Sequence, residues 1–103
     1  MTDNNIKQNI IDALESVEHP AIATTLRHLG ILRDHVVTDD LTVKLTLMLP
    51  FPNIPDNIRD YMVNSLAAAA QSAGGQLVEV KQGLMNDEER QSFLTIEQQN
   101  WRG

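Results

Sequence analysis

The segment LTVKLTLML at positions 41–49 runs directly into PFPNIP at positions 50–55, and together they decide the fold. Every odd position from 41 to 49 is aliphatic, whereas the even positions hold two threonines, a lysine and a methionine. A repeat of two residues is typical of a β-strand that buries one face. Pro50 and Pro52 end the pattern, because proline cannot donate to a strand ladder. We therefore predict a half-buried strand followed by a rigid connection.

Two further strands are expected to complete the sheet. Residues 31–37 should pair antiparallel with residues 41–49 through the turn at 38–40, whose Thr-Asp-Asp composition favours turns. A third strand is predicted at 77–81, with Val78 and Val80 on one face. A right-handed crossover would set this strand parallel to residues 41–49.

The first two helices are predicted upstream of the sheet. The first presents an apolar face at helical spacing, formed by Ile6, Ile10, Ala13, Leu14 and Val17. We expect it to stop near Val17, because Pro20 disfavours helical geometry at the residue before it. Pro20 itself suits the first turn of a short second helix. Gly30 is expected to end that helix.

Two more helices are predicted downstream. Asn53 is expected to cap the first of them, and Gly74-Gly75 to end it. Its inner face would be formed by Ile58, Met62, Leu66, Ala69 and Ala73. The second begins with Asn86-Asp87-Glu88-Glu89, which has the spacing of a capping box. Its apolar stripe would be formed by Phe93, Ile96 and Trp101.

This order of elements predicts an α+β fold. We expect a two-layer sandwich in which a three-stranded mixed sheet carries helices on one face, in the order α-β-β-α-β, plus a C-terminal helix. The length of 103 residues suits a single domain spanning residues 1–103. Residues 86–103 would form its C-terminal helical tail.

The net charge of −6 limits the classes of partner. Nucleic-acid binding depends on neutralising phosphates with lysine and arginine, and anionic membranes attract the same cations. We therefore expect no nucleic-acid and no membrane partner. The polar N-terminus is not typical of a secretory signal, and no apolar run has the length of a membrane span. We expect a cytoplasmic protein.

The chain contains no cysteine. Disulfides and thiolate metal sites are thereby excluded, and we expect no cofactor and no metal ligand set. The sequence also has no nucleophile motif and no phosphate-binding loop. These absences favour a protein that is not an enzyme, and we name no catalytic residue.

The sequence contains three short motifs: His19-Pro20, the step Leu29-Gly30-Ile31, and the proline-rich segment 50–55. Together they resemble the iron–sulfur cluster assembly domain family. The family includes stand-alone SUF and PaaD-type proteins and the N-terminal domain of Mrp-type P-loop ATPases. The resemblance covers roughly residues 6–82. It implies a role in cluster assembly or delivery, with an Mrp-type ATPase or apo iron–sulfur client proteins as partners.

The chain departs from the family pattern at its two proline turns. His19 stands where the family has an aspartate, and Ala21 replaces a glutamate. Pro52 or Ile54, depending on the alignment, stands where the family has its cysteine. Because clusters are usually held by thiolates, these departures argue against stable cluster binding by this chain.

The candidate partner-binding residues lie mainly in the proline-rich segment. That segment is either a rigid connection or a preorganised binding loop that exposes Phe51 and Ile54. His19 could contact a partner or bind iron transiently at the first proline turn. Trp101 is either a core cap or an exposed anchor. The full set is His19, Thr46, Pro50, Phe51, Asn53, Ile54 and Trp101.

Two functional hypotheses follow. The first is an accessory or adapter protein in iron–sulfur cluster assembly or delivery, which acts by protein–protein contact and lacks the family cysteine. The alternative is an interaction or self-association module of the same fold with no link to metal. A homodimer would form in the second case, through a strand edge or the tail helix.

Overall fold

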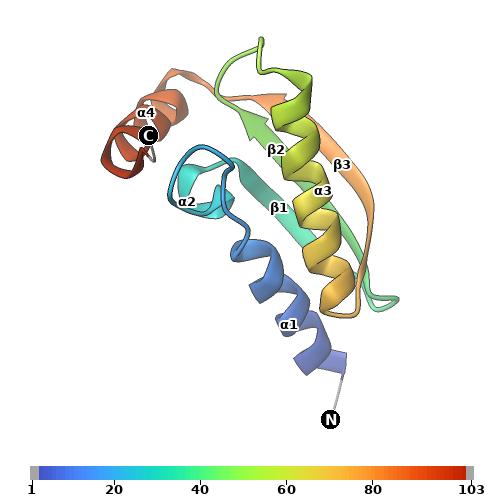
Figure 1. Ribbon diagram of the computed structural model, residues 1–103. Coiled ribbons are helices and arrows are strands. Elements are labelled where there is room, and N and C mark those ends of the chain that lie inside the picture. The colour runs from blue at the N-terminus through green and yellow to red at the C-terminus, as the bar shows by residue number, and fades with distance from the viewer. Residues whose placement is uncertain (1–2, 102–103) are drawn as a thin grey trace.

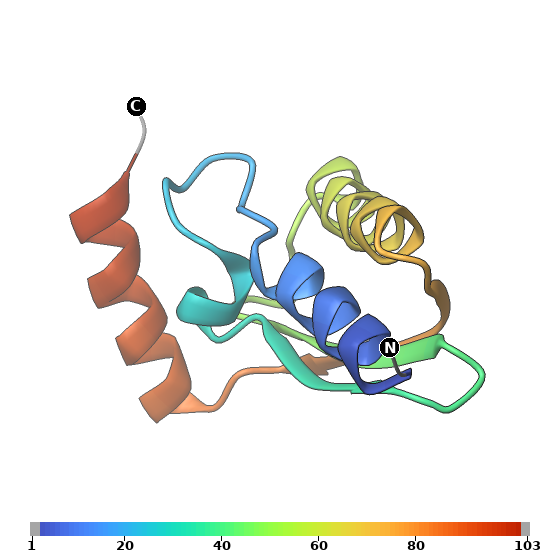
Figure 2. The same ribbon diagram turned by 90° about the horizontal axis from the view of Figure 1, so that it is seen from below.

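The computed structural model describes residues 3–101 and has the predicted α+β architecture (Figure 1). Its elements are α1 (Asp3–Glu15), α2 (Leu26–Leu29), β1 (Leu32–Val37), β2 (Thr42–Leu49), α3 (Asp56–Ser72), β3 (Gln76–Leu84) and α4 (Asp87–Asn100). Seen from below, α1 and α3 lie on the same side of the sheet, and the other side is left uncovered (Figure 2). The two-layer sandwich with helices on one face is confirmed.

Strand β2 is the centre of the sheet, as its sequence pattern predicts. It pairs antiparallel with β1 and parallel with β3, so the sheet is mixed and has the order β1-β2-β3. The odd-numbered side chains of β2 are buried beneath the helices: Val43, Leu45, Leu47 and Leu49. Helix α3 forms the crossover between the two parallel strands, which explains why β2 and β3 run in the same direction.

The prediction that Val78 and Val80 share a face of β3 is wrong. Leu77 lies opposite Val43 and Glu79 opposite Lys44, so Val78 is an extra residue in the ladder. Such a bulge lets Leu77 and Val80 both pack against the core, while Val78 stays exposed. The strict alternation assumed from the sequence fails at this one residue.

Two predicted helix starts are also corrected. Pro20 lies in a loop, and α2 begins only after Thr25, whose hydroxyl accepts a hydrogen bond from the His28 N–H. Asn53 is exposed in the turn before α3, and Pro55 takes the N-cap position without any side-chain cap. A proline is tolerated at a helix start because the N–H it lacks has no partner there. Gly30 ends α2 with a φ of 82°, as predicted.

Helix α4 packs against α2 and contributes Phe93 to the core. Asn86 and Glu89 form the predicted capping box, and Phe93 is buried while Ile96 is partly buried. Trp101 follows the helix and is 57% exposed. The predicted apolar stripe of α4 is therefore confirmed for Phe93 and Ile96 but not for Trp101. The last two residues of the predicted 86–103 tail lie outside the described residues. None of the helices within residues 3–101 is long and apolar enough to cross a bilayer.

Candidate functional site

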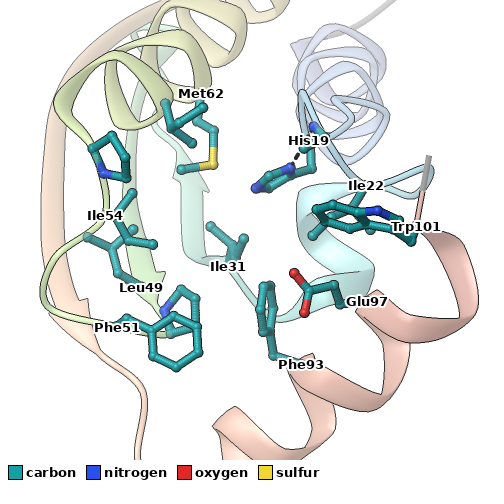
Figure 3. Close-up of a pocket in the computed structure, with 14 residues that line it drawn as sticks. His19, Ile22, Ile31, Leu49, Phe51, Ile54, Met62, Phe93, Glu97 and Trp101 are labelled. Atoms are coloured by element: carbon teal, nitrogen blue, oxygen red, sulfur yellow. Dashed lines mark hydrogen bonds between the residues drawn. The ribbon is translucent and has the colours of Figure 1, made fainter. Parts of the chain in front are cut away.

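A cavity of about 200 Å³ lies between α4, the loop before α2 and the proline-rich connection from β2 to α3. Ile31, Leu49 and Met62 line it on the side of the sheet and α3, and Phe51 and Ile54 line it from the proline loop (Figure 3). The opposite wall is formed by His19, Ile22, Phe93, Glu97 and Trp101. Most of these side chains are apolar, so the cavity is suited to an apolar group.

The proline loop, residues 50–55, is fixed to α4 by polar and aromatic contacts. Arg90 donates from Nε to the Pro50 carbonyl at 2.8 Å, and a second nitrogen donates to the Met85 carbonyl at 3.0 Å. The Phe51 ring meets Phe93 edge to face, with 6.5 Å between their centroids. The Arg90 guanidinium carbon lies 5.9 Å from the Phe51 centroid, within the range of a cation–π contact. These contacts hold Phe51 at the cavity while leaving it 37% exposed.

His19 presents its ring to the cavity from the loop before α2 (Figure 3). The Ala21 N–H donates to its Nδ1 at 2.9 Å, and its own backbone N–H donates to the Thr24 carbonyl at 3.1 Å. Because Nδ1 accepts a hydrogen bond, the neutral ring carries its proton on Nε2. The loop therefore fixes both the orientation and the tautomer of this side chain.

The end of α4 closes the cavity by pairing with the same loop. Ile22 and Trp101 form an isolated antiparallel bridge, and the Ala23 N–H donates to the Asn100 carbonyl at 2.7 Å. Glu97, one turn before Trp101, directs its carboxylate toward the cavity (Figure 3). Segments about 80 residues apart in the sequence thus share one wall.

The structure brings five of the seven predicted site residues to this cavity. His19, Pro50, Phe51, Ile54 and Trp101 all line it. Asn53 belongs to the proline loop but is exposed and does not line the cavity. Thr46 lies on the uncovered face of the sheet, opposite Arg33 on β1 and Lys81 on β3. The two-residue period of β2 directs it away from the helices, so it does not join the others.

Sequence reasoning missed Glu97 and Met62 as site residues. Glu97 lies four residues after Phe93, a spacing that places both on one face of α4, and four residues before Trp101, which follows the helix. That spacing was the available signal for Glu97. Met62 was correctly predicted as an inner residue of α3. Nothing in the sequence indicates that its side chain borders a cavity.

Electrostatic contacts strengthen the attachment of α4 rather than forming a reactive centre. Glu89 accepts from Arg33 on β1 and from the Asn86 N–H, and both contacts hold the pKa of its carboxyl below the ordinary value of 4.5. Within residues 3–101, no group of three or more His, Asp or Glu side chains is arranged to hold a metal ion.

No protein-family model, no curated protein and no solved structure matches this chain.

Proposed function

We propose that the chain is an accessory protein that acts by protein–protein contact at this cavity. The observation that carries the proposal is that the His19-Pro20 turn and the proline loop, about 30 residues apart, border one apolar cavity. Phe51 and Trp101 are both at its border and both substantially exposed. Exposed aromatic residues beside a preformed pocket are typical of the centres of protein interfaces.

The partner class in this proposal comes from the resemblance to the iron–sulfur cluster assembly family. Two of the three motifs on which that resemblance depends, the two proline turns, border the cavity. We therefore propose an Mrp-type P-loop ATPase or apo iron–sulfur client proteins as the partners, in the cytoplasm. The chain would contribute a docking surface, and any thiolate chemistry would belong to the partner.

Self-association is the second candidate, and one specific observation favours it. The sheet has an uncovered face on which Val36, paired with the exposed Lys44, is 56% exposed. Val78 and Leu84 on the edge strand β3 are also about half exposed. Exposed apolar side chains and a free strand edge are the features through which small sheets pair with a second copy.

Affinity capture from the native cell extract tests these two proposals against each other. The bait is the tagged chain, and its two matched variants are Phe51→Asp at the cavity and Val36→Asp on the uncovered face. We expect the wild type to recover iron–sulfur assembly or client proteins, and Phe51→Asp to lose them. Val36→Asp should retain them, because it lies on the other side of the sheet.

Folding of the variants is checked by thermal melting. Loss of the edge-to-face contact with Phe93 should cost about 0.5–1.5 kcal/mol in addition to the burial that Phe51 loses, so capture is compared only at a temperature where both variants are folded. Recovery of the chain alone, lost in Val36→Asp and kept in Phe51→Asp, would contradict the adapter proposal and favour self-association.

A further inference from the structure

We propose that the cavity receives the phenyl ring of a phenylalanine or tyrosine from a partner segment in which lysine or arginine flanks that residue. This inference rests on the proposed function, since it names the chemistry of the partner at the same cavity. Three properties of the cavity support it: its volume, the nature of its walls and its charge.

The volume fits one six-membered ring. Enclosed apolar cavities of roughly 150 Å³ accommodate benzene. The cavity here measures about 200 Å³, which leaves room for a ring and the methylene group that joins it to a backbone. A second, more open hollow adjoins it, since Glu97 and Trp101 line both and Gln98 lines the outer one. The residues that flank the inserted ring can lie across this outer hollow.

The walls favour an aromatic group over an aliphatic one. Phe51, Phe93 and Trp101 present three aromatic side chains to the cavity, and Met62 adds a thioether. Aromatic rings gain energy from edge-to-face contacts with one another, and sulfur makes favourable contacts with ring edges. A leucine, which is smaller, would obtain part of the apolar burial but neither of these directional contacts.

The charge of the site favours flanking cations. Glu97 contributes a carboxylate, whereas none of the described residues that line the cavity is a lysine or arginine. The nearby Arg90 is already held by the Pro50 and Met85 carbonyls and by Asp87. The chain as a whole carries −6, so the surrounding field also attracts a basic segment.

Binding of short capped peptides tests this inference directly. The probes are Gly-Lys-Phe-Lys-Gly, its leucine counterpart Gly-Lys-Leu-Lys-Gly, its acidic counterpart Gly-Glu-Phe-Glu-Gly, and free p-cresol. Trp101 is the chain's only tryptophan, so its fluorescence reports on the cavity wall, and the Met62 methyl signal reports on the interior. We expect the basic phenylalanine peptide to bind most tightly of the four and to shift both signals.

Two variants with matched controls identify the site of binding. Ala21→Leu puts a larger side chain into the cavity, whereas Ala23→Leu adds the same atoms at an exposed position outside its lining. We expect Ala21→Leu to weaken binding at least about tenfold, because the ring and the leucine cannot both be accommodated. Glu97→Gln should weaken it about two- to fivefold, the range of a partly exposed ion pair, and Glu88→Gln should not.

The inference would be overturned if the leucine peptide or the acidic peptide bound as tightly as the basic phenylalanine peptide. It would also be overturned if Ala21→Leu bound that peptide as tightly as the wild type does. Binding of p-cresol as tight as that of the peptide would indicate a small-molecule site instead. Failure of every peptide, while Phe51 still governs capture of iron–sulfur proteins, overturns the inference and leaves the proposed function intact. Peptide binding without such capture supports the cavity chemistry and contradicts the iron–sulfur role.

Discussion

At the scale of single residues, the orientation of the His19 ring depends on a local hydrogen bond. The sequence indicates a histidine before a proline, which by itself is compatible with an exposed or a capping role. In the structure the Ala21 N–H holds Nδ1, and the ring turns toward the cavity rather than toward solvent. The small side chain of Ala21 lines the cavity beside it.

Truncation of Leu45 tests the assignment of the two faces of β2. Leu45 is 2% exposed and lies under the helices, so Leu45→Ala should lower the free energy of unfolding by about 2–5 kcal/mol. Thr46→Ala, its neighbour on the uncovered face, should change it by no more than about 0.5 kcal/mol. Chemical denaturation of both variants measures the difference. If Leu45→Ala and Thr46→Ala lowered the free energy of unfolding equally, the two faces of β2 would be assigned wrongly.

Individual site residues could be predicted only where one local feature decides their position. Pro50, Phe51 and Ile54 were predictable because prolines interrupt a strand and leave a loop whose side chains cannot all be buried. Thr46 does not lie at the cavity, because the alternation that predicts its polar face also directs it away from the helices. Asn53 failed as a cap because Pro55, two residues later, takes that position.

At the scale of elements, the N-terminus of α4 is held by the Glu89 carboxylate, and protonation of that carboxylate should weaken the attachment. Arg33 and the Asn86 N–H keep the pKa of Glu89 below 4.5 in the folded protein, whereas unfolding removes both contacts. On acidification the unfolded chain therefore takes up this proton first, and protons favour unfolding. The stability that Glu89 provides is complete above about pH 4.5 and is lost as the pH falls through its lower folded pKa.

Glu89→Gln should expose this dependence. The variant is expected to melt at a lower temperature than the wild type at pH 7, and the difference should shrink as the pH is lowered from 4.5 toward about 3. Glu88→Gln, on the same turn of α4, serves as the control. Melting curves across this range measure the effect. A difference between Glu89→Gln and the wild type that stays constant with pH would contradict the role given to the Arg33 contact.

The elements themselves were largely predictable because their signals are strong and local. The alternation in β2, the capping box of α4 and the glycine after α2 each specify geometry within a few residues. The bulge at Val78 was not predictable, because it arises from the register between β3 and β2 rather than from either strand alone. Pro20 was compatible with a helix start, but pairing of Glu18 with Thr25 holds its segment as a loop.

At the scale of the whole molecule, the cavity exists only because distant segments meet. The bridge between Ile22 and Trp101 joins the loop before α2 to the end of α4, and Arg90 joins α4 to the proline loop. No periodicity or spacing in the sequence specifies these contacts. The pattern of β2 predicts the sandwich, whereas the cavity beside it follows from how α4 packs against α2 and the proline loop.

Photo-crosslinking in living cells tests the central claim most directly. The photoreactive residue p-benzoylphenylalanine replaces Phe51 at the cavity in one variant and Val36 on the uncovered face in another. We predict that irradiation links position 51, and not position 36, to an iron–sulfur assembly or client protein. Adducts formed from position 36 alone, or adducts with only a second copy of the chain at either position, would contradict the claim that the cavity is the docking surface.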